Sequence, residues 1–124
     1  MSSNSIPLLV RGEVILSPEL TSFDRATVYI YLENVSHQDA PATIVAQQTI
    51  AEVSHSIGTE NRVEFTLIVK EIDPQANYSV RVHVSLQSDR QIQAGDYIST
   101  ETYPVLTHGF GDRVSVGVVK LKVL

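Results

Sequence analysis

The residues that could do chemistry are few, and two of them stand in one polar stretch, LENVSHQDAPA (32–42). His37 and Asp39 are two positions apart there, and a third candidate ligand, His108, lies in a distant predicted loop. A zinc-type site needs three or four such ligands that converge on one point. These three residues are therefore the candidate binding residues of the chain. The competing interpretation of the stretch is a turn, because Asp39 and Pro41 are typical turn residues.

Motifs of the common enzyme classes are missing from the sequence. It contains no G-x-S-x-G elbow, no phosphate-binding loop and no dinucleotide-binding fingerprint. Glycoside hydrolysis needs two carboxylates in a cleft, whereas the glutamates in predicted strands occupy outward positions. We therefore predict no catalytic residues, no cofactor, no bound metal and no enzymatic activity. The alternative is a metal- or carbohydrate-binding β-sandwich protein, or a minor enzyme, that uses the loop His and Asp residues.

The composition of the chain excludes further kinds of site and partner. The chain has 124 residues, which suits a single domain, and it has no cysteine, so disulfides and thiolate ligands are excluded. Its formal net charge of −5 argues against nucleic-acid binding. No stretch approaches the about 20 apolar residues of a membrane helix, so we expect no transmembrane segment.

The elements that must position these residues are strands, because the dominant pattern is an alternation of apolar and polar residues. The stretch YSVRVHVSL (78–86) places Val82 and the other apolar residues on one face and His83 on the polar face, which predicts a half-buried antiparallel strand. No window has the periodicity of a helix. The other predicted strands are residues 9–16, 27–33, 43–50, 63–69, 97–105 and 113–123.

These strands predict an all-β fold, a single-domain antiparallel β-sandwich of about seven strands with Greek-key or immunoglobulin-like topology. We expect residues 1–7 to be a disordered N-terminal segment and residues 8–124 to be the domain. Tyr78 follows the turn IDPQAN at the spacing of a tyrosine corner, in which we expect the hydroxyl to bond to a buried backbone acceptor a few residues upstream. The alternation changes phase near Gly117, which predicts either a bulge or a strand that crosses between two sheets.

A sandwich of this size commonly binds a peptide by adding it as a strand at an exposed sheet edge. Residues 43–50 and 97–102 are rich in Thr, Gln and Ser and are the predicted edge strands. We therefore expect a protein or peptide partner at a sheet edge, and otherwise a monomer.

Three stretches together resemble the YbaY/YscW family of small bacterial lipoproteins, and they lie in residues 32–50, 72–84 and 103–119. The opening VRGEVIL (10–16) is similar to the first strand of that family. The type III secretion branch of the family acts as pilotins, which are lipoprotein chaperones for outer-membrane secretins. The resemblance implies a β-sandwich with a non-enzymatic, envelope-associated binding or chaperone-like role.

The chain departs from this family in one respect, since a lipoprotein needs a signal peptide and an acylated Cys, and this sequence has neither. As the sequence stands, we expect a cytoplasmic protein. If a lipoprotein signal was removed, we expect a periplasmic or membrane-anchored one.

Overall fold

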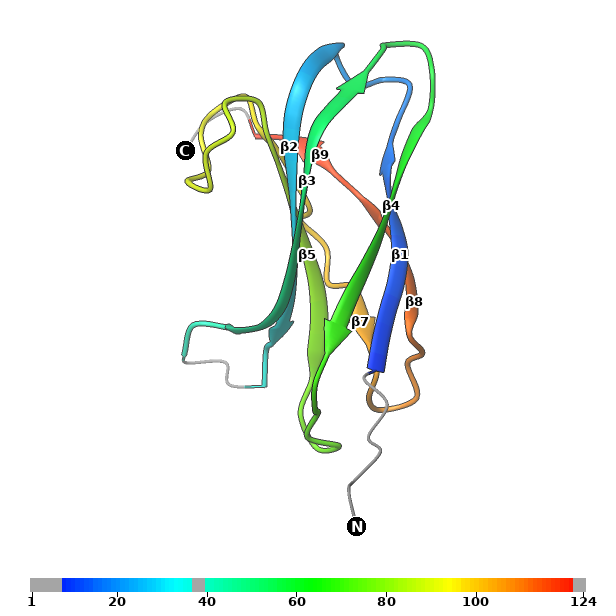
Figure 1. Cartoon of the computed structure of the whole chain (residues 1–124), viewed down its shortest axis with the longest axis vertical. Helices are drawn as coiled ribbons and strands as arrows, with labels where there is room; N and C mark the ends of the chain where they lie inside the picture. Colours follow the sequence, from blue (N-terminus) through cyan, green and yellow to red (C-terminus); the bar gives the residue numbers. More distant parts are fainter. Residues whose placement is uncertain (1–7, 37–39, 122–124) are drawn as a thin grey trace.

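The protein is a β-sandwich of two sheets, and its computed structural model describes residues 8–36 and 40–121 (Figure 1). The three-stranded sheet, here sheet A, has the order β4 (Asn61–Val69), β1 (Leu8–Leu16) and β8 (Arg113–Gly117). Sheet B has the order β3 (Thr43–His55), β2 (Phe23–Asn34), β5 (Tyr78–Ser85), β6 (Tyr97–Ile98) and β9 (Val119–Lys120), and β7 (Pro104–Val105) also pairs with β5. This architecture confirms the predicted all-β sandwich.

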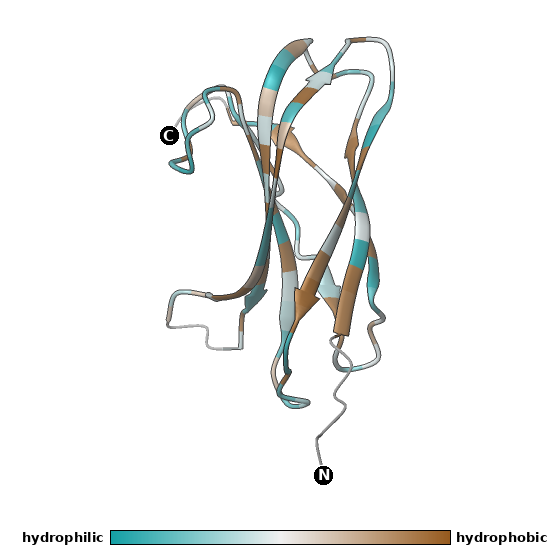
Figure 2. Cartoon of the chain, in the orientation of Figure 1, coloured by the Kyte–Doolittle hydropathy of each residue, from teal (hydrophilic) through white to brown (hydrophobic). Residues whose placement is uncertain are grey.

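The core lies between the two sheets and is built by the alternation seen in the sequence. Val82 is fully buried, as are Val10 and Val14 of β1 and Ile30 of β2. Figure 2 shows the consequence, with hydrophobic residues recurring along the strands of both sheets. Burying such a side chain contributes roughly 1.5–3 kcal/mol relative to its exposure, so these inward residues drive the packing of the two layers.

The outer face of β5 differs from the prediction. The sequence predicted a half-buried strand, but both faces of β5 are buried, with His83 1% and Ser85 0% exposed. The prediction is wrong on this point because polar residues on a strand face indicate solvent only when nothing else covers that face. Here a loop covers it, as described below.

Two predicted strands are each divided in the structure. The stretch 97–105 forms β6 and β7, and β6 lies between β5 and β9, so the prediction that 97–102 is an edge strand is wrong. The C-terminal stretch leaves sheet A as β8 and enters sheet B as β9. The phase change near Gly117 is therefore a crossing between sheets, the second of the two predicted explanations.

Sheet A contains a parallel pair, β1 with β8, inside a sandwich predicted to be antiparallel. Gly12 lies between Phe65 on one side and Val114 on the other, and its inward position is occupied by the Phe65 ring. A Cβ atom at residue 12 would be 2.8 Å from Cζ of Phe65 and would collide with the carbonyl oxygen of Val114. The close approach of β1 and β8 therefore requires glycine.

The predicted tyrosine corner is present, with one change of chemistry. Tyr78 is 4% exposed, and its hydroxyl accepts a hydrogen bond from the backbone N–H of Asp73 at 2.9 Å. The sequence had suggested a backbone acceptor as the partner, whereas the partner is a donor. The role of the hydroxyl is unchanged, since it satisfies a partly buried backbone group.

We predict that Tyr78→Phe lowers the free energy of unfolding by about 1–3 kcal/mol, because the Asp73 N–H loses its partner. Urea denaturation measures this change. Tyr103→Phe is the matched control, because its hydroxyl contacts exposed groups that water can replace. Equal losses for the two variants would contradict the corner.

We predict that Gly12→Ala lowers the free energy of unfolding by about 1–3 kcal/mol through overpacking between β1 and β8. Gly111→Ala is the control, because a Cβ there meets nothing within 4 Å and residue 111 has no positive φ. Thermal unfolding of both variants tests the prediction, and an unchanged midpoint for Gly12→Ala would show that β8 does not approach β1 this closely.

Candidate functional site

Two of the four histidines are structural. The His55 ring is buried and both of its nitrogens have polar partners, Oδ1 of Asn61 at 2.7 Å and the carbonyl oxygen of Leu20 at 3.1 Å. The His83 ring is buried, and its Nε2 donates to Oδ2 of Asp96 at 2.7 Å. Neither ring faces a ligand-accessible surface.

The predicted binding residues are described only in part. His108 is exposed in the loop after β7, and its Nε2 lies 3.3 Å from the carbonyl oxygen of Gln75. His37 and Asp39 lie outside the described residues, so the grouping of the three residues stays a prediction. Within residues 8–36 and 40–121, no group of three or more His, Asp or Glu side chains could hold a metal ion.

Two surface depressions are lined largely by polar and charged side chains. The first, of about 350 Å³, lies on the outer face of sheet A, where Glu13 pairs with Arg62 at 2.5 Å. Hydrogen bonding to Glu60, with the charge of Glu13, raises the pKa of the exposed Arg62 guanidinium. The second, of about 260 Å³, contains the pair of Glu33 with Arg81 at 3.0 Å. The first depression is also lined by Arg11, Glu64 and Arg113 and the second by Glu101, and none of these four residues is in an ion pair among the described residues.

Beside the second depression, the Tyr103 hydroxyl lies 3.1 Å from the N–H of Gly117, where the chain leaves sheet A. Burial raises the pKa of Tyr103, and the backbone contact with Gly117 opposes this shift. The residue therefore remains a neutral group, and its exposed hydroxyl contacts the start of the crossing segment without being buried there.

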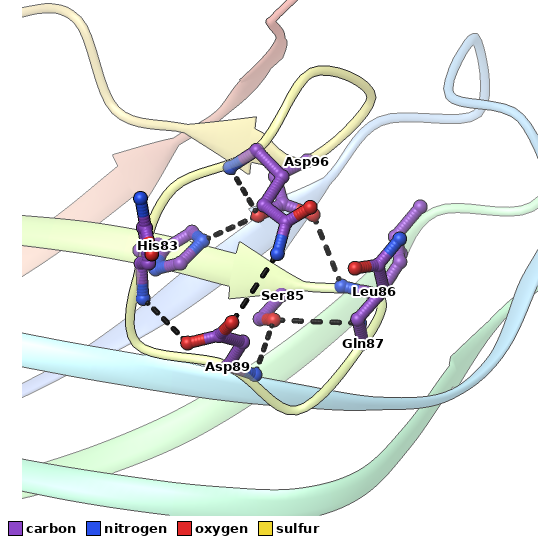
Figure 3. A network of polar contacts seen from close by, with 8 residues as sticks. His83, Ser85, Leu86, Gln87, Asp89 and Asp96 are labelled. Carbon is purple, nitrogen blue, oxygen red and sulfur yellow. Dashed lines mark hydrogen bonds and ion pairs between the residues drawn. The ribbon is translucent and has the colours of Figure 1, made fainter.

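A loop of residues 86–96, here the strap, folds back over His83 and Ser85 on the outer face of β5 (Figure 3). The buried carboxylate of Asp96 holds it, because Oδ2 accepts from His83 and from the N–H of Gln93, and Oδ1 accepts from the N–H of Leu86. Ser85 adds a second anchor, since its hydroxyl accepts from the N–H of Asp89 at 2.9 Å. These bonds explain how the polar face of β5 is buried at low cost.

The His83 ring is oriented by this anchor. An ionised carboxylate only accepts hydrogen bonds, so Nε2 of His83 carries the proton, and the buried Nδ1 has no partner in the described part of the chain. The ring also stacks against Tyr29 at a centroid distance of 5.6 Å. The sequence contained the turn signal Gly95–Asp96, but nothing in it indicated that Asp96 reaches a strand thirteen residues earlier.

The tip of the strap carries Arg90, whose guanidinium lies 4.8 Å from the ring centroid of Tyr29. The same group donates to Oε1 of Gln47 at 3.1 Å and to Oγ1 of Thr49 at 3.4 Å. Arg90 therefore connects the strap to β3, at the margin of sheet B.

Among the strands that the structure describes, β3 forms the longest free edge. β3 has thirteen residues and pairs only with β2, while β8 has five and β9 has two. The edge of β4 is occupied at its centre, because Oε1 of Gln48 accepts from the N–H of Thr66 at 2.8 Å. The structure thus places the predicted strand 43–50 at a sheet edge and leaves that edge open.

The direction of the backbone groups follows from the neighbouring strands. The N–H groups of Val80 and Val82 bond to residues 99–103, away from β2. Because N–H directions alternate along a strand, Arg81 bonds toward β2, where it is opposite Tyr31.

The backbone groups of β2 alternate in direction in the same way. Since those of Tyr31 bond toward β5, those of its neighbour Ile30 bond toward β3, where Ile30 is opposite Gln48. The backbone N–H and C=O groups of Gln47 and Thr49 therefore point to the free side. Bulges at Val45 and near Glu52 bound the regular part of this edge to residues 46–50.

The open edge has few of the features that normally protect such strands. β3 contains no Lys, Arg or Pro, and its one carboxylate is Glu52. Ile44 is 47% and Val45 is 40% exposed at its start. An edge of this kind is suited to receive a strand from another chain.

Comparison with known proteins now identifies the family. The model of the family described as type III secretion system lipoprotein chaperone (YscW) matches residues 7–118. The chain belongs to the YscW family. The resemblance inferred from three sequence stretches is therefore confirmed over most of the chain.

A solved structure similar to this chain is an alternative pilotin from the type II secretion system of Vibrio cholerae. It has 24% sequence identity and a TM-score of 0.68, and the match covers 92% of this chain and 98% of that one. At this identity the likeness establishes the shared fold. Among curated proteins no match was found.

Membership in the YscW family raises the question of membrane contact. Within the described residues, no helix has the length and apolar character needed to cross a membrane.

We predict that Asp96→Asn lowers the free energy of unfolding by about 2–4 kcal/mol, since one buried and two partly buried donors lose a carboxylate acceptor. The amides of residues 85–96 should also lose protection in hydrogen exchange. Asp89→Asn is the control in the same strap, because Asp89 is less buried, and it should cost under about 1 kcal/mol. Equal effects of the two substitutions would mean that Asp96 does not anchor the strap.

Proposed function

We propose that this chain is a non-enzymatic, chaperone-like domain of the bacterial envelope that binds an extended segment of a secretion-system protein. The observation that carries the proposal is the open edge of β3, with the backbone groups of Gln47 and Thr49 pointing away from the sheet. Membership in a family of secretion-system lipoprotein chaperones supports the same conclusion.

Binding at this edge would extend sheet B by one strand. The backbone bonds at Gln47 and Thr49 would supply affinity, and alternate side chains of the client would supply specificity. A client strand held in this way cannot pair with other exposed edges, which is the physical basis of a chaperone-like role. No bond is made or broken, so the proposal requires no catalytic residue and no cofactor.

We propose an envelope location for this activity, because the family is one of lipoproteins. The sequence given contains no Cys that could be acylated. An anchor would therefore have to come from chain that precedes it, or the client would have to bring the domain to the membrane.

We predict that Thr49→Pro weakens client binding at least about tenfold, because proline removes the outward N–H and places its ring where the client backbone would pair. The N–H of residue 49 does not bond to β2, so the sheet should remain intact. Thr49→Ala is the matched control, since it removes the hydroxyl and keeps the N–H, and its affinity should stay within about twofold of the unmodified protein.

The measurement uses fluorescence anisotropy with overlapping peptides that cover the secretin subunit of the same bacterium. Thermal unfolding checks that both variants are folded. Absence of binding by every peptide and by the whole subunit would overturn the proposed function. Equal affinities of the Pro and Ala variants would place the client elsewhere than at β3.

A further inference from the structure

We infer that the segment received by β3 is an extended strand with apolar side chains on its inward face and a carboxylate side chain on its outward face, read by Arg90. This inference rests on the proposed function, because it names the chemistry of the partner at the same edge. It follows from three observations on the surroundings of residues 46–50.

The first observation is the charge of Arg90. Its hydrogen bonds go to neutral groups, the Tyr31 hydroxyl and the side chains of Gln47 and Thr49. Arg90 is exposed, and none of the ion pairs among the described residues includes it. The adjacent Asp89 bonds instead to the N–H of Gln91 and the side chain of Gln93. A cation thus stands at the edge without an internal carboxylate.

The second observation is geometric. Gln47 and Thr49 present both their outward backbone groups and the side chains that Arg90 contacts. A strand added to β3 would lie about 4.8 Å away, with the residues opposite these two on the same outer face. Arg90 lies 3.4 Å from Oγ1 of Thr49, so a Glu or Asp directly across from it would be within reach of the guanidinium.

The third observation concerns the other face. Residues opposite Ala46, Gln48 and Ile50 would point between the two sheets, where Ala46 and Ile50 pack against the core. Apolar side chains of the partner would be buried there, which favours an alternation of apolar and acidic residues.

The partner in this inference is a different protein. A second copy of this chain would offer its own β3, whose regular part, AQQTI, carries no carboxylate for Arg90. The formal net charge of −5 also disfavours acidic segments on the rest of the surface. The preference for acid should therefore be confined to the positions that face Arg90.

The experiment selects displayed random decapeptides on the unmodified protein and on Arg90→Gln, Arg90→Glu, Arg25→Gln and Thr49→Pro variants. Arg25 is the matched control, because it is also an exposed arginine beside β3. It lies outside the regular stretch 46–50, where its guanidinium is 3.9 Å from the carboxylate of Glu52. Gln at residue 90 keeps an amide for Gln47 and Thr49, and thermal unfolding verifies the fold of each variant.

The expected result has four parts. The unmodified protein and Arg25→Gln enrich peptides with apolar residues at alternate positions and Asp or Glu between them. Arg90→Gln keeps the apolar alternation and loses the acidic bias, and Arg90→Glu replaces it with a basic bias. Thr49→Pro enriches no peptide. A Glu→Gln change in an enriched peptide weakens binding about fivefold to the unmodified protein and leaves binding to Arg90→Gln unchanged.

The results that would overturn this inference differ from those that would overturn the proposed function. Enrichment that Thr49→Pro abolishes but that shows no acidic bias, or a bias that Arg90→Gln leaves intact, would overturn this inference while the proposed edge stands. Enrichment that survives Thr49→Pro, or no enrichment on any variant, would overturn the edge itself. A dimer in sedimentation analysis that Thr49→Pro dissociates would assign the edge to a second copy of the chain and overturn the inference.

Discussion

The buried carboxylate of Asp96 is the interaction on which much of this molecule depends. It accepts hydrogen bonds from a strand side chain and from two backbone groups of the strap, and it is 2% exposed. A charge in such a place is tolerated only when its oxygens are well bonded. The backbone of the same residue also receives the N–H of Leu121, so the end of the described chain is attached to the same point.

The strap in turn decides what sheet B presents to its surroundings. It buries His83 and Ser85 on the polar face of β5, and its Arg90 guanidinium lies over the Tyr29 ring and donates to the Tyr31 hydroxyl. The Tyr31 ring itself is covered by Arg81 of β5. Without the strap, Tyr29 and His83 would be exposed on the outer face of the larger sheet. Among the described strands of sheet B, the longest unpaired margin is β3.

The four margins of the sandwich, formed by β3, β4, β8 and β9, differ in length and in what occupies them. The margins of β8 and β9 lie where the chain crosses between the sheets, and these strands have only five and two residues. The side chain of Gln48 occupies the middle of the β4 margin. Among the strands of residues 8–36 and 40–121, only β3 combines length with outward backbone groups in a regular stretch. Fold alone does not establish function, but this asymmetry is the feature of the sandwich that supports the proposed binding of a client strand.

The sequence by itself determined the strands, their inward faces and the tyrosine corner, because alternation and turn residues act over a few neighbouring positions. Only the tertiary structure decided that β5 is buried on both faces, that β1 and β8 are parallel, and that 97–102 is not an edge. Each depends on which distant segments meet. Asp96 reaches His83, and Arg90 reaches Thr49, only because the strap folds back over sheet B. The polar residues of such a loop have no periodicity, so their partners cannot be read from local sequence.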